Sequence, residues 1–145
     1  MLTTVRVALA MLAVSASPSV MADTIVQNDA RSGDRQVESF LETLKAGKGS
    51  EAVQTLLSSS PLWSQRVGTG EQMVGQIDAA IKAYGPVISY EKISSTPLGT
   101  MAVREFYLVQ HRDMVTRWEF HLLRTSKGWS IGYFGFTDQP AGWFS

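Results

Sequence analysis

The feature that most constrains the fold is a change of hydrophobic period at Gly85-Pro86. Before this dipeptide, the segment Glu71 to Tyr84 repeats apolar residues at offsets of 3, 4 and 7, which predicts a helix with one buried face. Glycine and then proline end that helix, because glycine readily adopts the left-handed conformation of a C-terminal cap and proline has no N–H to continue the helical hydrogen bonds. Strand-like patterns follow as far as Thr137. The chain is therefore expected to place its helices first and its sheet after them.

Four strand-like segments follow this helix, with short turns between them. Thr96 to Gly99, Arg112-Asp113 and Ser126 to Gly128 have the composition of turns. Connections this short join antiparallel neighbours, so the segments predict a meander. The expected strands are Val87–Ser95, Thr100–His111, Met114–Arg124 and Trp129–Thr137.

Two shorter helices are expected upstream. After Asp34, four apolar residues recur at helical spacing, and a second helix should run from Glu51 to about Ser58. Helices first and strands after indicate an α+β domain over residues 34–137, with three helices packed on a curved four-stranded antiparallel meander. The tail, residues 138–145, keeps Trp143 and Phe144, which are either docked on the domain or presented to a partner.

The first 22 residues have the pattern of a signal peptide. One positive charge at Arg6 precedes an apolar run over Val7 to Ala16, and small residues favour cleavage near Ala22. The run is shorter than the roughly 20 apolar residues of a membrane-spanning helix, although a retained anchor is the alternative. We expect a periplasmic or secreted protein that is free of the membrane after cleavage, with residues 23–33 as a flexible lead-in.

Composition narrows the classes of function. The chain has 13 basic and 13 acidic residues, and this balance argues against nucleic-acid binding. It contains no cysteine, which excludes disulfides and thiolate nucleophiles, and two histidines, which leave little for a metal site. We therefore expect no metal and no cofactor.

Turn lengths define a strand register, and that register brings one set of reactive side chains together. A four-residue first turn places Glu91 opposite Arg104, and a two-residue second turn places Arg104 opposite His121. Such a trio could act as a general base or bind a small anion. The alternative is a cross-strand ion pair that only stabilises the register. The other histidine, His111, is expected to be a solvated turn residue.

The same register predicts that both faces of the sheet are apolar. It pairs Tyr107 with Trp118, Phe120 with Tyr133, and His121 with Gly132. Three helices cover one face only, so the other is expected to meet a second copy of the chain. The alternative is a twisted sheet whose second face is wrapped by the helix link and the aromatic tail. The residues expected to contact a ligand are Arg104, Tyr107, Trp118, His121 and Phe134.

The order of elements resembles the NTF2-like, cystatin-like α+β superfamily, and in particular its small exported bacterial members of unassigned function. The resemblance covers residues 34–137. It implies a cone of helices and curved sheet, a pocket at the open end, and frequent dimers through the sheet. The motifs that carry it are Tyr84-Gly85-Pro86-Val87, Tyr90-Glu91, Arg104 through Tyr107, Trp118-Glu119-Phe120, Gly128-Trp129 and Phe134-Gly135-Phe136.

Three functions follow as hypotheses. The first is an exported, non-enzymatic module that binds a small apolar or amphipathic ligand, or a protein partner. Some members of the superfamily are isomerases, dehydratases or hydrolases, so the second is a pocket enzyme that uses His121 with Glu91 and Arg104. The catalytic pairs of those enzymes have no clear counterpart here, and no catalytic residue is carried over from them. The third is a structural or inhibitory subunit that docks through its sheet.

Overall fold

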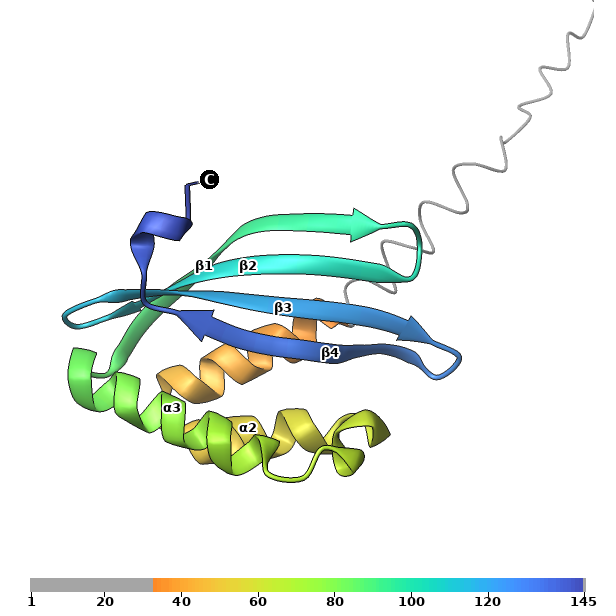
Figure 1. Ribbon diagram of the computed structural model, residues 1–145, viewed down its shortest axis with the longest axis horizontal. Helices are drawn as coiled ribbons and strands as arrows, with labels where there is room; N and C mark the ends of the chain where they lie inside the picture. The colour runs from red at the N-terminus through yellow and green to blue at the C-terminus, as the bar shows by residue number, and fades with distance from the viewer. Residues whose placement is uncertain (1–32, 145) are drawn as a thin grey trace, which may run out of the picture.

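The computed structural model describes residues 33–144, and in it a layer of helices covers one face of a four-stranded sheet (Figure 1). The first helix is described over residues 33–45. It is followed by α2 (Gly49–Ser58), the 3-10 helix η1 (Pro61–Gln65) and α3 (Thr69–Tyr84). The predicted signal peptide and most of the lead-in lie outside the described residues.

The sheet is an antiparallel meander in the order β1-β2-β3-β4. The predicted α+β class, with three helices before the sheet, is confirmed. The strands are β1 (Val87–Leu98), β2 (Ala102–His111), β3 (Val115–Thr125) and β4 (Gly128–Thr137), with the 3-10 helix η2 (Pro140–Gly142) in the tail.

Gly85 ends α3 as expected. Its φ of 86° lies in the left-handed region, and its N–H donates to the Ile81 carbonyl at 2.8 Å. A Cβ at this position would also approach Arg112 Cβ to 2.8 Å. Glycine is therefore required here both by backbone conformation and by the close passage of the β2–β3 turn.

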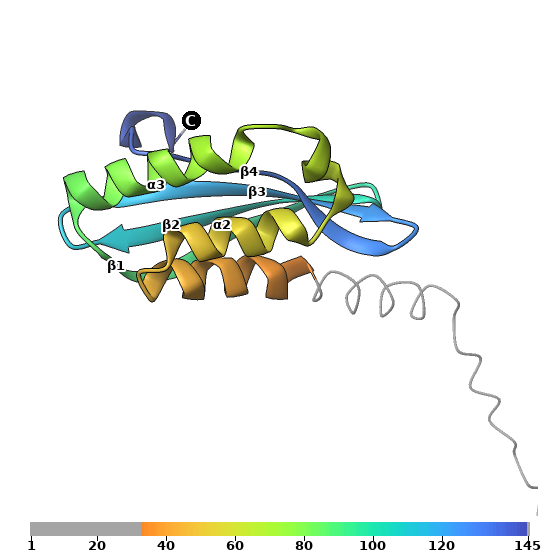
Figure 2. The ribbon, with the colours of Figure 1, turned by 90° about the horizontal axis from the view of Figure 1, so that it is seen from below.

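The core lies between the layer of helices and the sheet, and Figure 2 shows these two layers from the helix side. Aromatic rings fill the centre of the core. Phe40 of the first helix lies 5.4 Å from Trp118 and 5.8 Å from Phe120, measured between ring centroids. Phe134 lies 5.8 Å from the Phe40 ring and 5.5 Å from the Trp63 ring of η1, and both contacts are edge-on. These tilted and edge-on contacts join the first helix and η1 to two strands of the sheet, β3 and β4.

The predicted register is correct between β2 and β3 and wrong between β1 and β2. Arg104 pairs with His121 and Tyr107 with Trp118, as expected. Glu91, however, pairs with Leu108, and Arg104 pairs with Thr96. The reason is that β1 continues to Leu98, so the turn falls later than expected, and β1 carries irregularities that shift its pairing further along.

A β-bulge changes the faces of β4. Near the turn the predicted register holds, since Leu122 pairs with Ile131, but between His121 and Leu122 it shifts by one residue. His121 therefore pairs with Tyr133 and not with Gly132, and Phe120 pairs with Phe134. A shift of one residue reverses the faces, so Phe134 turns into the core and Tyr133 turns outward.

The tail after β4 is docked on the domain in part. Figure 1 shows η2 on the side of the sheet away from the helices. The Trp143 side chain is partly buried, whereas Phe144 is 90% exposed. Tyr84 also donates its hydroxyl to Asp138 at 2.5 Å, so the end of α3 is tied to the start of the tail.

Candidate functional site

The predicted trio of Glu91, Arg104 and His121 is not assembled. Arg104 and His121 are neighbours on β2 and β3, but Glu91 lies further along β1, opposite Leu108. His121 instead contacts Glu119, with 2.7 Å between Nε2 and Oε1, and packs on Tyr133 with 4.7 Å between ring centroids. The expected Glu91–Arg104 pair is therefore wrong, because the register that it needed does not form.

These residues belong to the outer face, the sheet surface that points away from the helices. At its centre the Phe106 ring is approached by two guanidinium groups, Arg104 at 5.2 Å and Arg117 at 4.7 Å. Leu123 and Tyr133 are about two-fifths exposed on the same face. The outer face is thus an aromatic and cationic surface with partly exposed apolar groups.

Three of the predicted ligand-binding residues lie in the core. Tyr107, Trp118 and Phe134 are all at most 4% exposed and contact the rings around Phe40. They serve as packing between sheet and helices. Only Arg104 and His121 of the predicted set lie where a partner could reach them.

His111 differs from the expectation of a solvated turn residue. It is 4% exposed, and its two ring nitrogens lie 3.0 Å from the Gly85 carbonyl oxygen and 3.2 Å from Thr116 Oγ1. The ring joins the end of α3 to the β2–β3 hairpin. Sequence reasoning placed the turn correctly but could not show that α3 ends beside it.

The structure contains one buried carboxylate that sequence reasoning missed. Glu105 is 1% exposed on the helix-facing side of β2. Lys92 Nζ lies 2.9 Å from Glu105 Oε1 and 3.0 Å from Asp34 Oδ2 in the first helix. Tyr107 donates its hydroxyl to Glu105 Oε2 at 3.2 Å. One ammonium thus bridges two carboxylates and joins the first helix to the sheet.

Burial dominates the electrostatics of this group. It raises the pKa of Glu105 to about 6, helped by the nearby Asp34 carboxyl and opposed by Lys92. Burial lowers the pKa of Lys92, but its bonds to Glu105 and Asp34 outweigh that effect and leave the pKa raised. The pKa of Tyr107 is raised as well, first by burial and then by the Glu105 charge.

A signal for this group was present in the sequence. Glu105 lies two and four residues before Tyr107 and Val109, in the phase that turns toward the helices. A charged residue in the buried phase of a strand needs a partner. The partner, Lys92, was not recognisable because the β1–β2 register was wrong.

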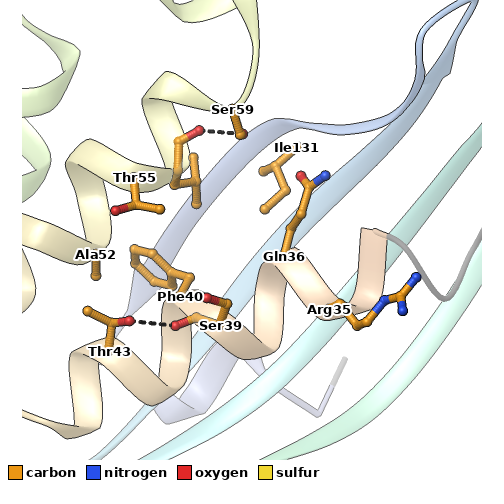
Figure 3. Close-up of a pocket in the computed structure, with 10 residues that line it drawn as sticks. Arg35, Gln36, Ser39, Phe40, Thr43, Ala52, Thr55, Ser59 and Ile131 are labelled. Carbon is orange, nitrogen blue, oxygen red and sulfur yellow. Dashed lines mark hydrogen bonds between the residues drawn. The ribbon is translucent and has the colours of Figure 1, made fainter.

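A pocket of about 210 Å³ lies between the first helix and α2 (Figure 3). Its floor is made of the buried residues Phe40, Ala52, Leu56 and Ile131. Side chains with hydroxyl groups form its rim, namely Ser39, Thr43, Thr55 and Ser59. Small residues face one another across the two helices, so the groove between them stays unfilled.

Two further observations concern residues 33–144 alone. None of their helices is long and apolar enough to cross a membrane. Their His, Asp and Glu side chains form no group of three or more that could hold a metal ion.

Comparison of the chain with protein-family models, with curated proteins and with solved structures found no match. The NTF2-like resemblance stays a prediction from the order of elements and the motifs.

Proposed function

We propose that this protein is an exported, non-enzymatic binding module that engages a second copy of itself through the outer face of its sheet. The observation that carries the proposal is the division of aromatic groups between the two faces. On the helix-facing side, the core buries Tyr107, Trp118 and Phe134. On the outer face, Phe106 and Tyr133 remain available to a partner.

The chemistry of the outer face suits a protein partner. Interface centres are enriched in aromatic residues and arginine, and here two guanidinium groups flank the Phe106 ring. Leu123 and Tyr133 extend the apolar surface on either side of His121.

Balanced charge favours a second copy as the partner. The alternation along the strands places Glu91 and Glu119 on the same face as Arg104 and Arg117. Two carboxylates and two guanidiniums on the described part of this face present no net charge to an identical surface. A two-fold interface requires such self-complementarity.

Export rests on the N-terminal pattern, and the domain type rests on the order of elements. The apolar run over Val7 to Ala16 and the small residues before Asp23 support cleavage and transport. Three helices followed by an antiparallel meander support an NTF2-like domain. A mass measurement on protein recovered from its own host tests export, since a chain that retains residues 1–22 would contradict it.

The experiment for the interface is size-exclusion chromatography with light scattering. We expect a dimer for the unchanged protein and a monomer for Phe106→Glu, because the variant places a charge at the centre of the interface. The substituted carboxylate lies beside Arg104 and Arg117, so folding should be retained. Val67→Glu is the matched control, since Val67 is 97% exposed and lies in the link before α3. A monomer for the unchanged protein at about 100 µM, well above the Kd of a stable dimer, would refute the proposal.

A further inference from the structure

We propose that Arg117 and Glu119 determine how two copies of the chain meet, with the Arg117 guanidinium of each copy paired with the Glu119 carboxylate of the other. This pairing rests on the proposed dimer through the outer face, and it adds the residues that select the partner. The two residues lie two positions apart on β3, about 7 Å along the strand. A two-fold axis that crosses β3 between them places each opposite the other in the partner.

Both side chains can be reached from outside the molecule. Alternation along β3 buries Trp118 and turns Arg117 and Glu119 to the outer face, where each is partly exposed. They line one shallow hollow of about 100 Å³, to which Gly135 of β4 contributes no side chain. The Glu119 side chain is 30% exposed. A side chain of a partner can therefore meet either charge without rearrangement of the sheet.

The two charges are still available for a partner. The Arg117 guanidinium lies 4.7 Å from the centre of the Phe106 ring, which holds it over the face. No carboxylate in residues 33–144 forms an ion pair with it. Glu119 is engaged on one side, where its Oε1 lies 2.7 Å from His121 Nε2, and its other oxygen can accept further hydrogen bonds. A guanidinium from the partner would thus meet a carboxylate that is already held in position.

The same axis brings apolar groups together beside the ion pairs. Phe106 lies opposite Glu119 in the β2–β3 pairing. Leu108 lies opposite Arg117. The axis therefore sets Phe106 of each copy against Leu108 of the other, and both side chains are half-buried within one copy. Sheets that pack face to face lie about 10 Å apart, a gap that an arginine and a glutamate side chain together span. The apolar contact excludes water from the ion pairs, which strengthens them.

This arrangement selects an identical partner. Desolvation offsets much of the attraction in a buried ion pair, whereas a like charge at either position costs several kcal/mol. A partner must therefore present a carboxylate and a guanidinium at the same spacing and in the reverse direction, as a second copy of β3 does. The tail borders this contact, since η2 lies at the end of the face where β4 stops (Figure 1), and no tail residue lines the hollow.

The test reverses the two charges separately and measures dimerisation by sedimentation velocity. We expect Arg117→Glu and Glu119→Arg each to weaken the dimer at least about a hundredfold, because each creates two like-charge contacts in the interface. An equimolar mixture of these variants should form a heterodimer within about tenfold of the original affinity, since every contact then joins opposite charges. Native mass spectrometry identifies the heterodimer, because its two chains differ in mass. Both substitutions in one chain should restore the homodimer.

Arg104→Glu is the matched control, because it reverses the other guanidinium beside the Phe106 ring. Its mixture with Glu119→Arg should give no heterodimer. Circular dichroism checks that each variant is folded, and the double variant tests the pairing without dependence on either single variant. A monomeric unchanged protein would overturn the outer-face dimer and this pairing together. A dimeric unchanged protein whose single reversals remain dimeric, or whose mixed variants remain monomeric, would overturn the pairing alone.

Discussion

Replacement of Glu105 by glutamine should change how stability depends on pH. In the folded protein the Glu105 carboxyl is buried beside Asp34, Lys92 and Tyr107, and its pKa is raised from 4.5 to about 6. The unfolded chain keeps the lower value. The folded state therefore binds the Glu105 proton more tightly, and this favours folding fully below about pH 4.5. The contribution is lost as the pH rises through about 6.

The magnitude follows from the difference between these two pKa values. At about 1.4 kcal/mol for each pKa unit, a rise from 4.5 to about 6 amounts to about 2 kcal/mol. Glu105 is 1% exposed, so solvent screening does not reduce this figure much. The free energy of unfolding of the unchanged protein should thus fall by about 2 kcal/mol between pH 4 and pH 7, relative to Glu105→Gln.

The assay is urea unfolding of both proteins at half-unit pH steps from 4 to 7.5, since urea carries no charge. Glutamine cannot ionise, so the difference between the two curves isolates Glu105 from the other carboxyl groups. Glu91→Gln removes an exposed glutamate from the same sheet and reports the effect of losing one negative charge. Parallel curves for the unchanged protein and Glu105→Gln across this range would refute the reasoning. A direct readout is the carboxyl carbon shift of Glu105 in NMR, which should titrate near pH 6.

Three further substitutions test the packing. Phe40→Ala should cost about 3–5 kcal/mol of unfolding free energy in urea, because it empties the centre of the aromatic core; a loss below about 1 kcal/mol would contradict that core. Gly132→Ala should cost about 1–3 kcal/mol, since its Cβ would lie 2.4 Å from Leu123 Cδ1. Its control, Gly75→Ala, meets no atom within 4 Å in α3 and should stabilise by about 0.5–1 kcal/mol. His111→Leu should cost about 1–3 kcal/mol of unfolding free energy and so lower the thermal midpoint, because the buried Gly85 carbonyl and Thr116 hydroxyl lose their hydrogen bonds to the ring nitrogens. An unchanged midpoint would mean that water replaces the ring nitrogens.

Local rules of the chain predicted most of the architecture. Periodicity identified the three helices and four strands, and turn composition indicated antiparallel neighbours. Gly85 marked the end of α3 because its conformation depends on its own backbone and on the proline after it. The β2–β3 register was also predictable, because a tight two-residue turn leaves little freedom in pairing.

Residues that meet only through tertiary contact were beyond such rules. The bulge at Gly132 lies against Leu123 of the neighbouring strand, and it decides that Phe134 is buried while Tyr133 is exposed. The salt bridge of Lys92 to Glu105 depends on a β1–β2 register displaced by irregularities in β1.

The groove beside Gln36 likewise exists only because two helices bring their small residues face to face. By itself the sequence determined which segments fold into helices and strands, and in what order, since periodicity and turn chemistry act over a few residues. Tertiary structure alone decided which side chains face one another. A single inserted residue moves the side chains of a strand to the opposite face of the sheet, and helix packing has no local signal in the sequence.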